Sequence, residues 1–293
     1  MKYYAPETLD EVTALLHELE SERVTILAGG TDVIAKRNCL PEESGWIRDN
    51  GNEVIPLEEH MIFLGNLNLD YILQEEKGIR IGTCTTLSNL VYNPIIEDKV
   101  SVLRDAITEI AGITIRNVAT LGGNVMNASP AADSIPALMV LDVKLVLTGT
   151  NGDRTVEISD FFKGPGKTTC RKNEFLKELI IPVCNGKTKF LKFGRRKAET
   201  LSVVNGAARV VINDGRCVEA RLAVGAVAPT PLRLITAEEM LIGKVVSEEL
   251  LEKVSNSVVK MIAPVSDKRS TAAYRETLTK VLVRRMLQEV CQQ

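Results

Sequence analysis

The sequence predicts an α+β protein with two domains. At 293 residues the chain is longer than one typical domain, so two domains are the natural expectation. Its second half carries three strand patterns followed by helix patterns, without the strict strand–helix alternation that indicates a parallel sheet. A short, polar, glycine-containing segment at 184–188 predicts the boundary, which divides the chain into residues 1–183 and 187–293.

The bulk composition is that of an ordinary globular protein. Hydrophobic residues make up 45% of the chain and charged residues 25%, and the formal net charge is −2. This charge balance favours neither nucleic acid nor an acidic membrane surface as a partner. No apolar run approaches the ~20 residues that a membrane-spanning helix needs, and the N-terminal segment lacks the apolar core of a signal peptide. We therefore expect a cytoplasmic protein.

The cysteine and histidine patterns predict no metal site. The six cysteines stand at positions 39, 84, 170, 184, 217 and 291. None belongs to a CxxC pair, whereas zinc and iron–sulfur sites usually take at least two ligands from one short turn. Disulfides are not expected in a chain without a secretory signal. The two histidines, His17 and His60, lie in charged helix-like or loop settings, and neither has a partner pattern for a catalytic triad.

Apolar spacing predicts the elements in order. Apolar residues at helical spacing indicate a helix over 8–19, and a β-branched run indicates a strand over 24–27. The dipeptide at 151–152, Asn-Gly, is a hairpin signal. The charged segment 37–61, with the only tryptophan, Trp46, predicts a surface excursion. The other predicted elements are a helical turn at 33–36, strands at 62–65, 79–83, 144–147, 156–158, 175–181, 189–193, 202–212 and 218–227, helices at 86–92, 100–111, 135–141, 236–241, 247–261 and 271–290, and a flexible turn at 163–167.

Two loops of small residues stand out among these elements. The first, AGGTD at 28–32, follows a strand, and the second, at 120–133, begins TLGGN and interrupts a core-like region. Small residues let the backbone approach a large ligand closely, and neighbouring N–H groups then converge on an anion. The spacing matches neither GxGxxG nor GxxxxGK[ST], which argues against a Rossmann site and against a P-loop.

Each loop alone is explained by a tight bend whose glycines satisfy positive φ. The presence of two such loops favours a single diphosphate held between them, and a dinucleotide is the common ligand of that shape. Asp32 would repel a pyrophosphate that it faced, so we expect its carboxylate to cap the turn instead.

Three longer segments resemble a known family. They are IRNVATLGGNVMNASPAADSIPAL at 115–138, FLKFGRRKAETLSVVNGAARV at 190–210 and AVGAVAPTPLR at 223–233. With the AGGTD loop, in this order and at this chain length, they are similar to the flavin-binding subunit of the molybdenum hydroxylases. That family includes xanthine dehydrogenase, carbon monoxide dehydrogenase and nicotinate dehydrogenase. The resemblance covers nearly the whole chain.

The resemblance implies a fold and a cofactor. The fold is the two-subdomain FAD-binding fold of the vanillyl-alcohol oxidase (PCMH) type, divided near 55–61 and followed by a C-terminal α+β domain of three strands and helices. The cofactor is non-covalent FAD, with its pyrophosphate on the two loops. The residues implied to bind it are Leu27, Ala28, Gly29, Gly30, Thr31, Asp32, Val33, Ile34, Ile110, Thr120, Leu121, Gly122, Gly123, Asn124, Asp133, Leu176 and Lys192.

Four of these residues lie outside the segments 27–34 and 120–124. By the resemblance, Ile110 lies against the cofactor, Asp133 hydrogen-bonds its polar part, Leu176 contacts it from the last strand of the flavin domain, and Lys192 is a basic residue near the flavin. No residue of the chain is implied to be a general acid or base, and none to bind a metal.

The resemblance also implies a place in a larger enzyme. The chain is expected to be the electron-transfer subunit of a xanthine dehydrogenase-like heterotrimer. Substrate is then oxidised at a molybdenum cofactor on one partner subunit, electrons pass through [2Fe–2S] clusters on another, and FAD on this chain delivers them to NAD. Purine is the first choice of substrate, with carbon monoxide, nicotinate or another heteroaromatic left open. The segment 37–61 is longer than expected for the family, which suggests an added loop or partner contact.

Two alternatives keep the same fold. A free-standing flavin oxidase would commonly hold FAD covalently through His or Cys, and neither residue type lies within the two loops. A regulatory module without turnover would not need both loops intact. Arg195 and Arg196 fit either a solvated basic strand end or a site for NAD.

Overall fold

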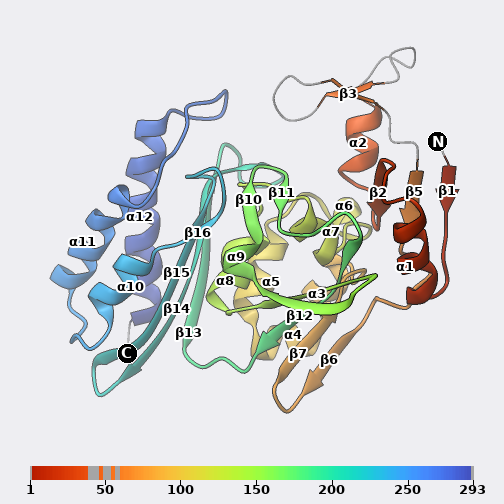
Figure 1. Ribbon diagram of the computed structural model, residues 1–293. Helices are drawn as coiled ribbons and strands as arrows, with labels where there is room; N and C mark the ends of the chain where they lie inside the picture. The colour runs from red at the N-terminus through yellow and green to blue at the C-terminus, as the bar shows by residue number, and fades with distance from the viewer. Residues whose placement is uncertain (1, 39–45, 49–53, 57–59, 292–293) are drawn as a thin grey trace.

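The computed structural model describes residues 2–38, 46–48, 54–56 and 60–291 (Figure 1). This part of the chain forms an N-terminal sheet with a helix, a central sheet with helices, and a C-terminal sheet with helices. The predicted α+β class is therefore confirmed. Among the described helices, none combines the length and the apolar character needed to cross a membrane.

The N-terminal unit is a parallel sheet covered by one helix. Helix α1 (Leu9–Glu18) buries Val12 and Leu16 in a cluster that includes residues of the sheet. The Thr8 hydroxyl caps this helix by accepting a hydrogen bond from the N–H of Glu11. The other elements are β1 (Lys2–Tyr4), β2 (Val24–Leu27), α2 (Val33–Asn38), the antiparallel pair β3 (Trp46–Arg48) and β4 (Val54–Pro56), and β5 (His60–Phe63), with the sheet order β1-β5-β2.

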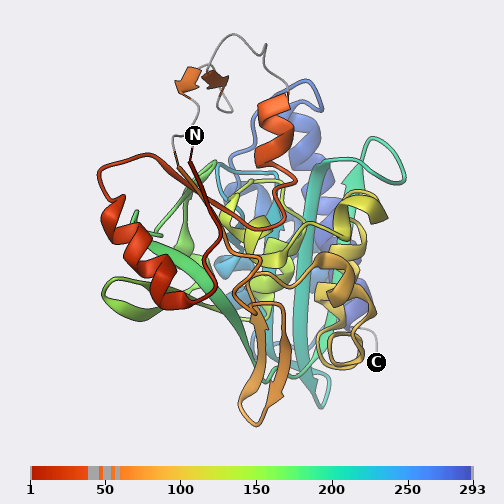
Figure 2. The ribbon, with the colours of Figure 1, turned by 90° about the vertical axis from the view of Figure 1, so that its right-hand side faces the viewer.

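The central unit is an antiparallel sheet with the order β6-β7-β12-β8-β9. Its strands are β6 (Ile72–Glu75), β7 (Gly78–Gly82), β8 (Lys144–Gly149), β9 (Gly152–Glu157) and β12 (Glu174–Pro182). The β6–β7 hairpin projects beyond the body of the molecule (Figures 1 and 2). The remaining elements are α3 (Leu87–Tyr92), α4 (Pro94–Lys99), α5 (Ser101–Thr108), α6 (Ile113–Arg116), α7 (Leu121–Met126), α8 (Ser134–Val140), α9 (Ile158–Phe161) and the short hairpin of β10 (Phe162–Gly164) and β11 (Lys167–Thr168).

The C-terminal unit is an antiparallel sheet with helices on one face. Its strands are β13 (Lys187–Gly194), β14 (Ser202–Asn213), β15 (Arg216–Gly225) and β16 (Leu232–Arg233), in that order. Its helices are α10 (Ile235–Leu241), α11 (Glu248–Ser257), the 3-10 turn η1 (Val258–Lys260) and α12 (Ala272–Cys291). These helices cover the outer face of the sheet, and α5 and α8 of the central unit pack against the inner face (Figure 1).

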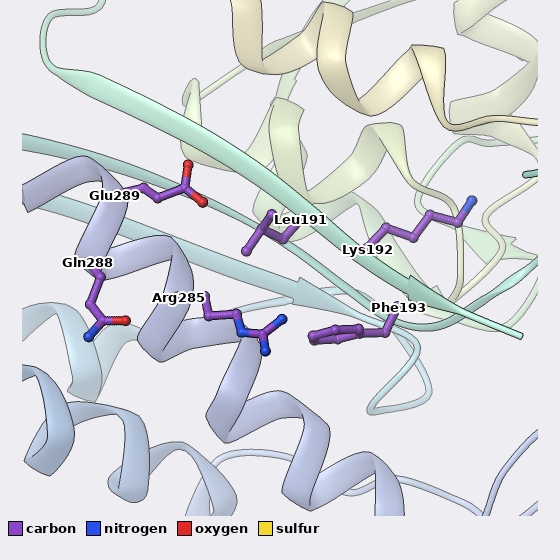
Figure 3. A pocket seen from close by; sticks show the side chains of 6 residues that line it. All are labelled: Leu191, Lys192, Phe193, Arg285, Gln288 and Glu289. Carbon is purple, nitrogen blue, oxygen red and sulfur yellow. The ribbon is translucent and has the colours of Figure 1, made fainter. Parts of the chain in front are cut away.

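Strand β13 shows how the C-terminal sheet packs between its own helices and the central unit. Successive side chains of a strand point to opposite faces, and here Leu191 and Phe193 pack toward α12, where the Arg285 guanidinium lies 5.7 Å from the Phe193 ring centre. Lys192 extends away from the Phe193 and Arg285 side chains (Figure 3), and Phe190 joins the core of the central unit. The inner face of the C-terminal sheet therefore packs against the helices of the central unit.

A network of ion pairs links the central unit to the C-terminal unit. Asp142, in the turn after α8, accepts hydrogen bonds from Arg209, Arg221 and Arg233 of the C-terminal sheet, with N···O distances of 2.7 to 3.2 Å. The Arg209 side chain is only 5% exposed, so its charge depends on carboxylate partners. Asp142 has φ +50°, a conformation that Asp and Asn tolerate better than most residues.

Several predicted elements differ from the structure. The loop prediction for 120–133 is wrong in its first half, because α7 begins directly after Thr120. The predicted helix at 100–111 ends at Thr108 and is preceded by the unpredicted α4. His60 lies in β5, is 7% exposed and stacks on Tyr4, so its predicted charged setting is also wrong.

Other differences are omissions. Strands β1, β6 and β16 were not predicted, so the C-terminal sheet has one strand more than expected. Of the predicted surface excursion at 37–61, residues 39–45, 49–53 and 57–59 and the side chain of Trp46 lie outside what the structure describes.

Candidate functional site

The two small-residue loops meet in space. A Cβ atom added to Gly29 would lie 2.0 Å from the carbonyl oxygen of Val118 and 3.1 Å from the Cα of Ala119. Only glycine allows this approach, because real Cβ atoms do not come within 3 Å of backbone atoms. The first loop is therefore packed directly against the segment that leads into the second loop.

The first loop carries amide groups available to a ligand. Within the described part of the chain, the backbone N–H groups of Gly29 and Thr31 donate no hydrogen bond. Gly30 adopts φ +68°, which turns the chain so that the carbonyl of Gly30 accepts from the N–H of Ile34 at the start of α2. Buried or enclosed N–H groups need a partner, and an anion supplies one.

The second loop has a different construction from the one predicted. Its residues form the first turn of α7, capped by the Thr120 hydroxyl, which accepts from the N–H of Gly123 at 3.1 Å. The N–H groups of Leu121 and Gly122 donate to the carbonyls of Thr85 and Thr83. The expectation of free amides converging on an anion is therefore met by the first loop and not by residues 121–123.

The two glycines of α7 have separate roles. A Cβ on Gly122 would lie 1.8 Å from the Thr83 hydroxyl oxygen, so Gly122 allows close packing on the strand end. A Cβ on Gly123 would meet only the Thr120 hydroxyl, at 3.0 Å, and otherwise open space. Gly123 therefore presents bare backbone to the space between the loops.

That space is a cavity of about 720 Å³. Its walls are strand β2 and the first loop, the start of α7, and the segment from Pro165 to Leu176. The predicted site residues that line it are Leu27, Ala28, Gly29, Gly30, Thr31, Asp32, Val33, Thr120, Gly122, Gly123, Asn124 and Leu176. The structure thus brings both loops and the predicted residue of β12 onto one cavity.

Five predicted residues do not line this cavity. Leu121, the first residue of α7, is fully buried, and the Ile34 side chain is half exposed on α2. Ile110, Asp133 and Lys192 lie where the central unit meets the C-terminal sheet. The Lys192 ammonium donates to the Asp133 carboxylate at 2.7 Å and to the Glu109 carbonyl at 2.8 Å.

Asp133 is the centre of a buried polar cluster. Besides Lys192, the hydroxyl of Ser202 and the amide of Asn205 donate to its carboxylate, and the Asp133 and Lys192 side chains are 7% and 5% exposed. The next residue, Ser134, donates to the Asn124 side chain at 2.6 Å. The adjacent residues Asp133 and Ser134 therefore hydrogen-bond in two directions, Asp133 to the C-terminal sheet and Ser134 to α7.

The turn that carries Ile110 is fixed by one arginine. The Nη1 of Arg116 donates to the carbonyls of Thr108, Ile110 and Ala111, at 3.1, 2.9 and 2.7 Å. The first of these carbonyls belongs to the last residue of α5 and the other two follow it, at a helix end where a cation is electrostatically favoured. The backbone from Thr108 to Ala111 is therefore held in one conformation.

Sequence reasoning missed the third wall of the cavity. The residues from β11 to the start of β12 that line it include Lys167, Cys170, Arg171, Lys172 and Glu174. Their signal in the sequence was a cluster of basic residues after the Gly-Pro-Gly turn at 164–166.

Two side chains of this wall have shifted pKa values. Burial, with the nearby Glu174 carboxylate, raises the pKa of Cys170 to about 12, so this thiol is protonated and unreactive. A bidentate hydrogen bond from Arg154 lowers the pKa of Glu174, which stays ionised. Among the described residues, no group of three or more His, Cys, Asp and Glu side chains is placed to hold a metal ion.

Comparison with known proteins decides the family. Residues 46–184 match the family model described as the FAD binding domain in molybdopterin dehydrogenase, and residues 189–290 match the CO dehydrogenase flavoprotein C-terminal domain. The xanthine dehydrogenase FAD-binding subunit of Escherichia coli O157:H7 is 32% identical over 98% of this chain and 94% of that protein. The chain belongs to the FAD-binding medium subunits of the molybdenum hydroxylases.

Other members are similar over their whole length. The nicotinate dehydrogenase FAD-subunit of Eubacterium barkeri is 29% identical over 100% of this chain and 96% of that protein. The solved carbon monoxide dehydrogenase of Hydrogenophaga pseudoflava superimposes with a TM-score of 0.89 and 27% identity, over 99% of this chain and 96% of that one. The predicted family and fold are therefore confirmed, and the chain is an FAD-dependent oxidoreductase subunit.

The residues present fit FAD. Free amides at Gly29 and Thr31 suit a pyrophosphate, which is best held by fixed N–H dipoles. The bare backbone of Gly123 leaves room for it, as a larger side chain at this position would fill that room. The cavity continues past the loops along β2 to Phe175 and Leu176, so it is longer than a phosphate alone requires.

Proposed function

We propose that this medium subunit passes electrons from [2Fe–2S] clusters on a partner subunit, through non-covalent FAD, to NAD, in a molybdenum hydroxylase that oxidises a purine. The observation that carries the FAD site is the meeting of two distant small-residue loops on one cavity. FAD, when bound, supplies redox chemistry that links one-electron and two-electron carriers. The residues of this chain bind and orient it, and none is proposed to transfer a proton.

The binding roles divide along the chain. The amides of Gly29 and Thr31 and the hydroxyl of Thr31 hold the pyrophosphate, with Gly123 leaving space for it. Leu176 contacts the cofactor inside the cavity. Asp133 and Lys192, which form a buried pair 2.7 Å apart, mark the side toward the C-terminal sheet where the resemblance puts the flavin. Because they neutralise one another, the pair offers a polar surface with little net charge.

The choice of a purine rests on similarity. The xanthine dehydrogenase subunit is 32% identical, while the nicotinate, glyceraldehyde and carbon monoxide dehydrogenase subunits are 28–30% identical. The ending PTPLR at 229–233 is the further support. The reacting substrate is bound on the molybdenum subunit, so the discrimination depends on a chain other than this one.

Native purification tests the assembly and the substrate together. We expect the chain, isolated under native conditions from its source, to bring two other polypeptides, one with iron–sulfur clusters and one with the molybdenum cofactor. We expect the complex to oxidise xanthine or hypoxanthine faster than nicotinate or carbon monoxide. A preparation that oxidises its substrate with this chain alone would contradict the assembly, and a preference for carbon monoxide would contradict the purine.

Substitution of two arginines tests whether NAD is the electron acceptor. Arg195 and Arg196 follow β13, are exposed, and each donates a hydrogen bond to a nearby loop carbonyl, of Lys268 and Glu199 respectively. If they bind NAD, replacing both with Ala lowers the rate at which NAD reoxidises the reduced complex about fivefold in stopped-flow mixing, given ~1 kcal/mol for the lost charge-assisted contacts. Transfer to an artificial dye is retained. Unchanged reoxidation by NAD would place the nicotinamide elsewhere.

A further inference from the structure

The two loops leave the charge of a pyrophosphate unbalanced. A pyrophosphate diester carries two negative charges, yet segments 28–34 and 120–124 contain no lysine or arginine, and their one charged residue is Asp32. Amide dipoles stabilise an anion without neutralising it. Any balancing cations of this cavity must therefore come from another wall.

The segment from β11 to the start of β12 supplies cations to the same cavity. Lys167, Arg171 and Lys172 line it, and we call these three residues the cationic rim. The one carboxylate of this wall, Glu174, is already paired through the bidentate hydrogen bond from Arg154, at 2.8 and 2.7 Å. Because Arg154 already neutralises most of the Glu174 charge, this carboxylate does little to balance the positive charges of the rim.

The members of the rim differ in their availability. Arg171 lies 3.5 Å from the Glu174 carboxylate and its N–H also donates to that group. Within the part of the chain that the structure describes, the side chains of Lys167 and Lys172 form no ion pair and no hydrogen bond. Among the described residues that line the cavity, Lys167 and Lys172 are thus cations without a protein partner.

The backbone of the rim is held in place. The N–H of Gly166 donates to the carbonyl of Ala128, just after α7, at 3.1 Å. The N–H of Thr169 donates to the carbonyl of Phe161 at 2.9 Å, and the Cys170 thiol to that of Glu174 at 3.4 Å. These contacts fix the two lysines beside the second loop, so an anion bound there meets them without rearrangement of the chain.

We propose that Lys167 and Lys172 are phosphate-binding residues that balance the charge of the adenosine-diphosphate half of the cofactor. This assignment rests on the proposed FAD site and adds to it a second wall with the opposite chemistry. One wall offers neutral amides, and the other offers exposed ammonium groups that approach the phosphates from solvent.

The test compares charge removal with charge retention in the full chain. The variant K167M/K172M keeps the side-chain length and removes both charges, whereas K167R/K172R keeps the charges. Lys163 is exposed on β10 and does not line the cavity, so K163M is the matched control. Apoprotein of each variant is titrated with FAD and with ADP at 50 and 300 mM salt, and thermal unfolding of the apoprotein reports folding.

We expect K167M/K172M to bind both FAD and ADP about tenfold more weakly than the parent at low salt, because two ion contacts at a partly exposed site are lost. The difference should narrow at high salt, since screening weakens the parent's contacts. K167R/K172R and K163M should bind like the parent, and all apoproteins should unfold at the same temperature.

Three results would overturn the proposal. Parent-like affinity of K167M/K172M would show that the rim does not contact the phosphates. A loss of affinity that is equal at both salt concentrations, or that K163M shares, would mean a structural effect. A parent chain that takes up no FAD would contradict the proposed function itself, which separates that failure from a failure of the rim alone.

Discussion

Replacing Gly123 with Asp should abolish FAD binding while leaving the fold intact. Gly123 is the third residue of α7 after the Thr120 cap, a position where an acidic side chain stabilises a helix. The added Cβ meets only the Thr120 hydroxyl, at 3.0 Å, which a small rotation relieves. By contrast, any side chain at Gly122 would lie 1.8 Å from Thr83, so that position offers no clean test.

The expected magnitude follows from Coulomb's law. A carboxylate ~6 Å from one negative charge of the pyrophosphate, at an effective dielectric constant of ~20, is repelled by about 3 kcal/mol. Each 1.4 kcal/mol is a factor of ten in affinity, so FAD should bind at least ~100-fold more weakly. The isosteric Gly123→Asn adds the same volume without the charge, and its loss should be several-fold smaller.

Visible absorption of the purified variants and FAD titration of their apoproteins measure the effect. Circular dichroism and thermal unfolding check that each variant folds. A folded Gly123→Asp protein that holds FAD at full occupancy with parent affinity would refute the assignment of this cavity. A loss in Gly123→Asn as large as in Gly123→Asp would refute the electrostatic part of the reasoning.

Three further predictions concern stability and reactivity. Asp142→Asn keeps the left-handed backbone conformation but removes the carboxylate shared by three arginines, so chemical unfolding should show a loss of about 1–3 kcal/mol in the free energy of unfolding. The control is Asp98→Asn at an exposed position, whose free energy of unfolding should stay within ~0.5 kcal/mol of the parent. Equal losses in the two variants would contradict the stabilising role of the Asp142 network. Because the pKa of Glu174 is lowered in the folded state, its contribution is present above the ordinary value of 4.5 and is lost as pH falls through the lowered pKa. Glu174→Gln should therefore lower the free energy of unfolding by ~1–3 kcal/mol at pH 7, and this difference in stability from the parent should shrink below pH 4.5. A difference in stability that grows on acidification would contradict a lowered pKa for Glu174. Cys170, with its pKa raised to about 12, should resist iodoacetamide at pH 8 in the folded chain and react with it in urea. Peptide mass mapping would measure the labelling. Rapid labelling of the folded chain would mean that the thiol is not buried.

The sequence predicted the location of the site better than its construction. Both loops were found from their small residues, but Gly29 is small for a reason other than the expected one, since the backbone of Val118, and not a ligand, approaches it. The helix at α7 was missed because two adjacent glycines have low helix propensity. In the structure the Thr120 cap and the packing of Gly122 on Thr83 outweigh that propensity.

Contacts between distant segments could not be read from local patterns. The cationic rim lies more than thirty residues from either loop in sequence, and only the pairing of β12 with β8 and β7 brings it to the cavity. The pairing of Asp133 with Lys192 likewise joins two units through a tertiary contact, and only the family resemblance pointed to either residue. Helix α4 was detectable, because Asn93-Pro94 is a helix start signal with a cap and a proline at the first position.

The flavin content of the purified chain tests the central claim most directly. The full-length chain is precipitated with acid, and the flavin in the supernatant is identified by chromatography and quantified against protein. Two loops that hold FAD without a covalent bond predict one FAD per chain, released completely into the supernatant. A colourless chain that binds no added FAD, or flavin that stays with the precipitated protein, would contradict the claim.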